Sequence, residues 1–187
     1  MLSYKHGYHA GNQADVLKHI CLIQAYKSLK RHHNSISYID THAGSGDYNF
    51  KIDYMSKNKE YENGITKLES YKYENQSIKF YLKVLRNINN SKKMTFYPGS
   101  PSIISHLSDS SDKLLFYELH NNEVQLLRKH LAKQINSKIY NKDGFEFFLH
   151  KINPKEKTLV LIDPSYEIKD DFEKIVKTLK VLDEEYE

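Results

Sequence analysis

The residues that follow one predicted strand could bind and orient a planar base. Residues 158–162 are five apolar or β-branched side chains in a row, which predicts a strand buried on both faces. Asp163, Pro164, Ser165 and Tyr166 follow directly, at the end where buried parallel strands carry function. Together they offer a carboxylate, a backbone carbonyl and an aromatic ring, a set that suits a base with an exocyclic amino group. The alternative is a plain strand-to-helix turn in which Asp163 is the helix N-cap.

An acidic residue stands at or just after the end of each of the four predicted strands. These acids are Asp40, Glu118, Asp143 and Asp163, and in a parallel sheet they lie along one edge. The Gly-x-Gly turn of residues 44–46 lets the backbone approach a ligand closely. Glu118 could then hold ribose hydroxyls, and Asp143 could accept from an adenine amino group. Singly, Glu118 or Asp143 could equally be a helix N-cap or a surface acid, but the four together indicate an adenosine-type cofactor site.

A nicotinamide-binding Rossmann protein is the competing interpretation of the glycine turn. Such a protein would have a third glycine and an acid about 20 residues further on. Here the third glycine is absent, and Glu118 follows Gly46 by 72 residues. The dinucleotide interpretation also gives no role to the turn at residues 163–166, so it is disfavoured.

Helices and strands alternate along the chain, which predicts an α/β layer with a mostly parallel sheet and right-handed crossovers. A polar stretch at about residues 50–93 interrupts the alternation and is expected to be a helical insertion, with helical patterns at 62–71 and 77–88. A tight turn at residues 97–101 leads into a short helix. The remaining strands are expected at 36–40, 114–117, 137–140 and 158–162, and the remaining helices at 12–33, 121–133, 145–149 and 170–182.

Composition favours one globular domain without a disulfide or a membrane span. The chain has 187 residues and a net charge of +4, a mild basic excess that is compatible with a nucleic-acid partner. The single cysteine, Cys21, excludes an intrachain disulfide and a cysteine-based zinc site, and the apolar run of residues 20–23 predicts that it is buried. No apolar stretch approaches the roughly 18 residues of a transmembrane helix, and no signal-peptide core is visible. We therefore expect a cytoplasmic protein with no membrane partner.

The segment before the first helix has its own composition. Residues 1–11 are dense in Tyr, His and Lys but too poor in apolar residues to pack a core. This predicts a basic, aromatic arm that closes over a nucleic acid. An exposed polar cluster is one alternative. A metal site built from Asp15 and nearby histidines is another, but the spacing matches no standard zinc pattern, so no metal is expected.

Several segments together resemble one family in order along the whole chain: residues 1–19, 40–46, 97–101, 118–120, 143–144 and 163–166. The family is RlmJ, bacterial methyltransferases that use S-adenosylmethionine to modify the N6 amine of adenine 2030 in 23S ribosomal RNA. The resemblance implies a Rossmann-like class I methyltransferase fold with a helical insertion after the first strand. It also implies one methyltransferase domain over residues 1–187, with an RNA-contacting arm at 1–11 and the insertion at about 50–93.

The resemblance further implies roles for individual residues. The cofactor S-adenosyl-L-methionine would be bound by His19, His42, Ser100, Glu118, Asp143, Gly144 and Asp163. Asp163, Pro164 and Tyr166 would be catalytic: the carboxylate and the Pro164 carbonyl accept from the amine, and Tyr166 stacks on a flipped adenine. Tyr4, His6 and Lys18 would contact RNA. The expected partner is protein-free 23S RNA or an early assembly intermediate, and the expected oligomeric state is a monomer without metal.

Two departures from the family pattern carry expectations of their own. Ser165 stands where the family has a second proline, and a looser turn should reduce the rate. Family members also continue beyond residue 187, so we expect the sheet to lack its C-terminal strands and the fourth strand to have an open edge. The alternatives are a truncated or inactive relative that binds RNA or S-adenosylmethionine without turnover, and an adenine-N6 methyltransferase acting on another nucleic acid.

Overall fold

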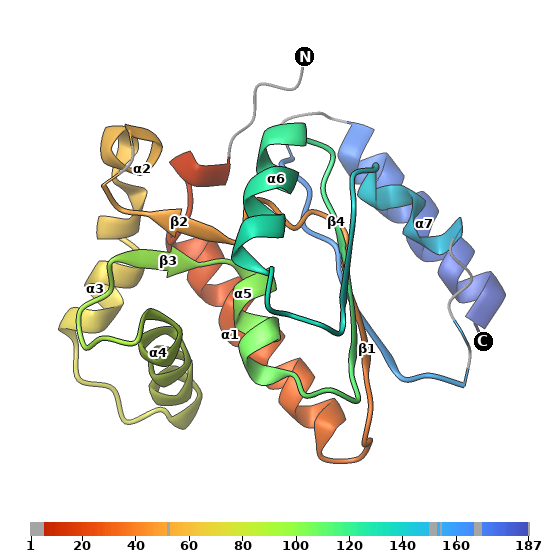
Figure 1. The fold of residues 1–187 in the computed structure, drawn as a ribbon, viewed down its shortest axis with the longest axis horizontal. Helices are drawn as coiled ribbons and strands as arrows, with labels where there is room; N and C mark the ends of the chain where they lie inside the picture. The colour runs from red at the N-terminus through yellow and green to blue at the C-terminus, as the bar shows by residue number, and fades with distance from the viewer. Residues whose placement is uncertain (1–5, 52, 150–152, 154, 167–169, 187) are drawn as a thin grey trace.

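A four-stranded parallel sheet forms the centre of the molecule (Figure 1). The computed structural model describes residues 6–51, 53–149, 153, 155–166 and 170–186. The sheet has the order β5-β4-β1-β6, built from β1 (Ser37–Asp40), β4 (Lys113–Tyr117), β5 (Ser137–Tyr140) and β6 (Thr158–Leu161). All three pairings are parallel, so the predicted parallel α/β fold is confirmed. The carboxyl ends of the four strands consequently share one edge.

Helices cover both faces of this sheet (Figure 1). On one face lie α1 (Gln13–Lys30), α5 (Ser100–Leu107) and α6 (Asn121–His130). Their apolar side chains form a core with the strands that includes Tyr26, Ile104 and Leu127. On the other face lie the 3-10 helix η3 (Gly144–Leu149) and α7 (Asp170–Tyr186), whose Phe147 and Leu182 pack with Ile39. The helices therefore leave the carboxyl edge of the sheet accessible.

The residues after β1 form a small two-stranded sheet and a group of helices. β2 (Asp47–Asn49) pairs antiparallel with β3 (Phe96–Pro98), a pairing that the sequence did not predict because each strand has only three residues. Between them lie α2 (Asp53–Asn58), η2 (Glu60–Glu62), α3 (Ile65–Ser70) and α4 (Gln76–Asn89). A second core of fully buried side chains, including Tyr81, Leu85 and Tyr97, joins these helices to α1 and α5. We call residues 53–89 the helical insertion.

The prediction that Cys21 is buried is wrong. Its side chain is exposed, and Leu17 on the same side of α1 is 65% exposed. Successive helical residues turn by about 100°, so the apolar run of residues 20–23 cannot all face the core. Leu22 and Ile23 are buried, and Ile20 is partly buried against the core.

β6 is an edge strand in the described part of the sheet. Beside it, α7 exposes Phe172, Val176 and Leu179 to 59%, 53% and 52%, a stripe of apolar side chains at helical spacing. None of the helices in the described ranges is both long and apolar enough to cross a membrane.

Candidate functional site

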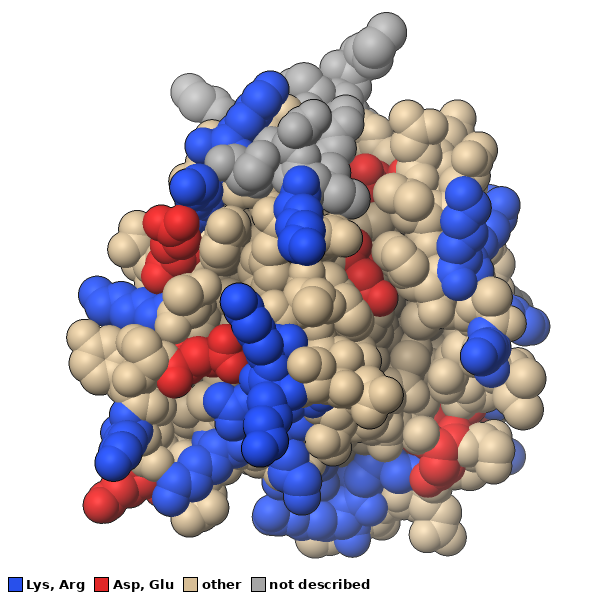
Figure 2. Space-filling model, turned by 60° about the vertical axis from the view of Figure 1, so that its left-hand side comes forward, with Lys and Arg blue, Asp and Glu red and all other residues tan. Residues whose placement is uncertain are grey.

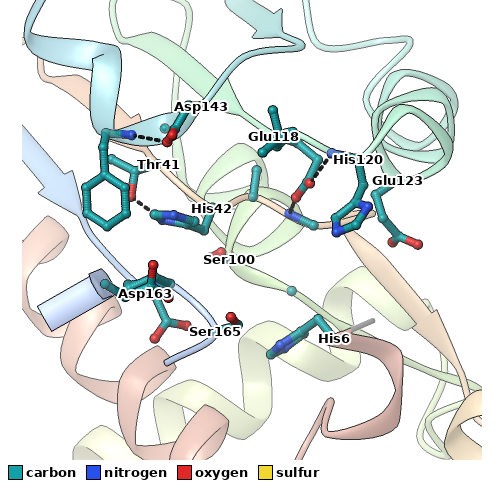
Figure 3. Close-up of a pocket in the computed structure, with 18 of the residues that line it drawn as sticks. His6, Thr41, His42, Ser100, Glu118, His120, Glu123, Asp143, Asp163 and Ser165 are labelled. Atoms are coloured by element: carbon teal, nitrogen blue, oxygen red, sulfur yellow. Dashed lines mark hydrogen bonds between the residues drawn. The ribbon is translucent and has the colours of Figure 1, made fainter. Parts of the chain in front are cut away.

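A pocket opens at the carboxyl edge of the sheet, where loops from all four strands meet α1 and α5 (Figure 3). The sequence-predicted residues that line it are His6, Lys18, His19, His42, Ser100, Glu118, Asp143, Gly144, Asp163 and Pro164. Tyr4 lies outside the described residues. The fold thus gathers into one pocket residues that are scattered over most of the chain.

Glu118 is tied to the turn that follows β1. Its Oε2 accepts from the Gly44 amide at 2.8 Å, and its Oε1 accepts from the His120 amide at 2.7 Å. Burial raises the pKa of Glu118, and these two amides oppose the rise. Gly44 has a φ of +62°, and a Cβ there would collide with the Tyr48 hydroxyl, so the turn requires glycine. Each carboxylate oxygen keeps acceptor capacity toward the pocket.

The loop after β5 lies directly against the loop after β1. Asp143 Oδ1 accepts from the Phe145 amide at 3.0 Å, which fixes the start of η3. A Cβ on Gly144 would overlap the Thr41 carbonyl oxygen, so only glycine permits this approach. Between the two loops, the His42 ring meets Phe145 edge-on at 5.0 Å, and burial lowers the pKa of His42. Asp143 and His42 are thereby held on neighbouring walls of the pocket (Figure 3).

Asp163 is linked to the start of the chain through Lys18. The Lys18 ammonium donates to Asp163 Oδ2 at 2.7 Å and to Asp15 Oδ1 at 2.6 Å, and His6 Nε2 lies 3.0 Å from Asp15 Oδ2. Burial alone would raise the pKa of Asp15, but His6 and Lys18 lower it well below the usual range. Burial alone would also lower the pKa of Lys18, but the two carboxylates raise it. Lys18 therefore stays charged and holds one oxygen of Asp163.

The link from Asp15 through Lys18 to Asp163 is a contact that sequence reasoning missed, because it considered Asp15 only as a metal ligand. The i,i+3 spacing of Asp15 and Lys18 on α1 was the available signal, but 145 residues separate Lys18 from Asp163. Asp15 also accepts from the Gly11 amide at 2.9 Å, so it connects the segment before α1 to the pocket.

His19 lines the pocket and has one ring nitrogen that is buried. Its Nδ1 shares a hydrogen bond of 2.8 Å with the Tyr97 hydroxyl, which lies 3.0 Å from the Tyr81 hydroxyl. Among the described residues, the buried nitrogen, Nε2, has no hydrogen-bond partner. Burial, with the positive charge of Lys18, lowers the pKa of His19 to about 3, so the ring is neutral near pH 7. A buried polar atom without a partner is costly, and a bound ligand could remove that cost.

Asp40 lies behind the pocket rather than in its wall. It accepts from the Tyr38 hydroxyl at 3.0 Å and from the His42 amide at 3.3 Å. Burial raises the pKa of Asp40 to about 6. Asp40 thus holds the turn after β1, and Ser100 at the start of α5 lines the pocket in front of it.

Tyr166 lies beside the pocket and is not among the residues that line it. Its ring is 45% exposed and rests against Phe172 at a centroid distance of 5.1 Å, and its φ is +57°. An exposed ring at this position remains accessible to a base. The described residues contain no group of three His, Cys, Asp or Glu side chains that could hold a metal ion.

Comparisons with known proteins indicate the family of this chain. A family model described as "RsmJ: Ribosomal RNA large subunit methyltransferase D, RlmJ" matches residues 33–185. The chain is 38% identical over 182 residues to "Ribosomal RNA large subunit methyltransferase J" of Haemophilus influenzae, and 37% identical over 177 residues to the protein of the same name from Escherichia coli. These alignments cover 96% and 94% of this chain but 65% and 63% of the relatives. The chain therefore spans just under two thirds of their length.

A solved structure supports the same conclusion. The crystal structure of a Legionella pneumophila protein assigned to the family DUF519 matches with a TM-score of 0.84 at 32% identity. The match covers 95% of this chain and 66% of that one. Sequence and fold therefore lead to one conclusion: the chain belongs to the RlmJ family of ribosomal RNA large-subunit methyltransferases.

Proposed function

We propose that this chain transfers a methyl group from S-adenosylmethionine to the exocyclic N6 amine of an adenine, adenine 2030 by family analogy, in 23S ribosomal RNA. The observation that carries the proposal is the pocket itself, which Asp163 and Pro164 line together with Glu118, Asp143 and His19. Glu118, Asp143 and His19 suit an adenosine moiety, and Asp163 and Pro164 suit an amine.

The residues present fit the cofactor. The unpartnered Nε2 of His19 offers a buried hydrogen-bonding atom, and Glu118 retains acceptor capacity for ribose hydroxyls. Asp143 is placed to accept from an adenine amino group, while His42, Ser100 and Gly144 complete the walls. When bound, S-adenosylmethionine supplies an electrophilic methyl group on a positively charged sulfonium. Because burial keeps His19 neutral, its ring adds no charge that would repel that cation.

Asp163 and Pro164 would orient the accepting amine. The bond from Lys18 uses Oδ2 of Asp163, which leaves Oδ1 free to accept one N–H of the amine, and the Pro164 carbonyl can accept the other. Both bonds favour a pyramidal nitrogen whose lone pair is available. An aspartate carboxylate is too weak a base to deprotonate an aromatic amine in advance, so Asp163 would receive the proton as the nitrogen–carbon bond forms. Lys18 acts by holding the carboxylate in place.

Basic surface outside the pocket supports an RNA substrate. Figure 2 shows lysine and arginine side chains gathered on the side of the molecule that carries α3 and α4. On α4, Lys79, Lys83 and Arg86 are exposed and share one face by their spacing. The Lys27 ammonium of α1 lies 3.8 Å from the centre of the ring of Phe80, which belongs to α4. This contact places α1 next to the basic face of α4. These cationic side chains could bind the phosphate backbone of an RNA. Nearer the pocket, His6 and Lys18 would contact the target region, and Tyr166 would stack on the flipped base. The family resemblance implies an RNA contact for Tyr4 as well.

The test is transfer of radiolabelled methyl from S-adenosylmethionine to protein-free 23S RNA from cells that lack the modification. Asp163→Asn keeps the shape of the side chain but removes the carboxylate, and it should lower transfer at least 100-fold. Asp170→Asn is the matched control, because Asp170 is an exposed acid at the start of α7, and it should be silent. Labelled RNA with the native chain and none with Asp163→Asn would support the proposal. No transfer by the native chain would refute it.

The two alternatives from sequence predict different results in the same assay. A chain that only binds would bind S-adenosylmethionine in calorimetry or RNA in a filter assay without transferring label. An adenine-N6 methyltransferase for another nucleic acid would label a competitor DNA or RNA in preference to 23S RNA.

A further inference from the structure

One acidic residue of the helical insertion, Glu60, makes two side-chain contacts with the segment that precedes α1. We call residues 6–12, the described part of this segment, the arm. Glu60 of η2 contacts the arm twice: its Oε1 lies 2.9 Å from His9 Nδ1, and its Oε2 accepts from Asn12 Nδ2 at 3.0 Å. The Glu60 and His9 side chains are 34% and 38% exposed. An ion pair this exposed adds little stability by itself, so the value of the contact lies in where it holds the arm.

Asn12 joins Glu60 to the start of α1. Its Oδ1 accepts from the Asp15 amide at 3.0 Å and caps the helix. Its Nδ2 donates to Glu60. The Asn12 side chain thus caps α1 with its oxygen and binds Glu60 with its nitrogen. An aspartate at position 12 could cap the helix but could not donate to Glu60.

The backbone of the insertion approaches the arm at the same place. The Ile65 amide donates to the Gly11 carbonyl at 2.9 Å. A Cβ on Gly64 would overlap that carbonyl oxygen, so the two segments lie in direct backbone contact. The insertion therefore contacts the arm at His9, Gly11 and Asn12.

The other end of the arm reaches the pocket. His6 lines the pocket and contacts Asp15, the carboxylate that also pairs with Lys18. The His6 ring also meets Tyr48 of β2 edge-on at 5.2 Å. A displacement of the arm at Glu60 would therefore displace His6 from the mouth of the pocket.

We propose that Glu60 is a positioning residue: it anchors the arm to the helical insertion so that His6 is held where the RNA target enters. The insertion then has a specific task in substrate binding, although its helices contribute no side chain to the pocket among the described residues. Glu60 itself does not touch the pocket. The effect on RNA rests on the proposed function, whereas the anchoring of the arm does not.

The test uses one disrupting variant and one matched control. Glu60→Ala removes both bonds to the arm. Glu62→Ala removes a neighbouring exposed acid of the same 3-10 helix, whose ion-pair partner is Lys59 at 3.8 Å. The first readout is hydrogen exchange of the peptide that covers residues 6–12, measured without RNA. The second is the KM for RNA and kcat in the methyl-transfer assay, with the affinity for S-adenosylmethionine as a reference.

Glu60→Ala should speed exchange of the arm and raise the KM for RNA about tenfold, which corresponds to about 1.4 kcal/mol. The value of kcat and the affinity for S-adenosylmethionine should stay near those of the native chain, and Glu62→Ala should match the native chain in every readout. Unchanged exchange of the arm in Glu60→Ala would overturn the proposal. Faster exchange with an unchanged KM for RNA would overturn it as well.

An exchanged pair of side chains gives a rescue test. Asn12→Asp keeps the cap of α1 but sets a carboxylate against Glu60, so it should weaken RNA binding as Glu60→Ala does. In the double variant that adds Glu60→Gln, the new amide can donate to the carboxylate introduced at position 12 and still accept from His9, and protection of the arm and the KM should return. Failure of the double variant to recover would count against the anchor. If the native chain transfers no methyl group, the proposed function fails, and the exchange data still decide whether Glu60 anchors the arm.

Discussion

Replacing His19 by phenylalanine should weaken binding of S-adenosylmethionine without destabilising the fold. The phenyl ring can keep the stacked contact with Tyr97, whose ring centre lies 5.5 Å away. The variant loses both ring nitrogens, one shared with the Tyr97 hydroxyl and one without a partner. Tyr97 keeps its bond to Tyr81, so no new polar atom is stranded by the change.

The magnitudes follow from the cost of hydrogen bonds. Loss of one bond to the ligand should raise the Kd for S-adenosylmethionine about fivefold to tenfold, or about 1 kcal/mol. In the free protein, the loss of the bond to Tyr97 is offset by removal of a buried unpartnered nitrogen, which itself costs about 1–3 kcal/mol. The free energy of unfolding should therefore stay within about 1 kcal/mol of the native value or increase.

Calorimetry of cofactor binding and urea unfolding of the free protein provide the two measurements. Tyr97→Phe is the control with the opposite signature. It leaves His19 Nε2 in place but removes the hydroxyl shared with His19 and Tyr81, so it should lower stability and spare binding. Native affinity in His19→Phe, or a loss of stability above about 2 kcal/mol, would refute the assignment of Nε2 to ligand binding. Because the pKa of His19 is lowered to about 3, its contribution to binding should not change between pH 5 and pH 8.

Three further predictions concern the turn after β1, the turn after β6 and the basic surface. The pKa of Asp40 is raised to about 6 in the fold, so the folded protein binds a proton more tightly than the unfolded chain. As the pH rises from about 4 to 6, the free energy of unfolding of the native chain should then fall by on the order of 3 kcal/mol relative to that of Asp40→Asn. Above pH 6 the difference should stay constant. Urea unfolding of both proteins across this range checks it, and parallel pH profiles would contradict it. Ser165→Pro should raise turnover by stiffening the turn after β6, measured as kcat for methyl transfer; an unchanged or lower kcat would show that the serine does not limit the rate. Lys83→Glu should weaken RNA binding and reduce the slope of log K against log salt by about one, whereas Lys180→Glu on α7, with the same change of charge, should match the native slope. Equal slopes for both variants would show that α4 is not part of the RNA-binding surface.

The sequence predicted residues of the pocket because each of them could be identified from the local pattern at the end of one strand. Apolar runs gave the strands, and the acids Glu118, Asp143 and Asp163 stand just after three of them. Parallel strands necessarily bring their carboxyl ends to one edge, so convergence of these side chains required no detailed knowledge of packing. The same reasoning placed Asp40 in the site, but the structure puts it behind the turn, where it accepts from Tyr38 and His42.

The features that sequence reasoning missed depend on side chains far apart in the chain. β2 and β3 are three residues each, too short for a period-2 pattern to register. Cys21 was assigned to the core because an apolar run does not show which of its members faces inward. The contact of Lys18 with Asp163 and that of Asn12 with Glu60 join residues 145 and 48 positions apart. No local pattern records such pairs.

By itself, then, the sequence determined a parallel α/β fold, a row of acids at one sheet edge and a turn suited to an amine, because hydrophobic period and strand ends are encoded locally. Only the tertiary structure decided that Lys18 holds one oxygen of Asp163, that a buried ring nitrogen of His19 has no partner among the described residues, and that Glu60 contacts the arm. Those outcomes depend on how helices pack onto the sheet. Packing is set by the complementarity of whole surfaces rather than by any short stretch of residues.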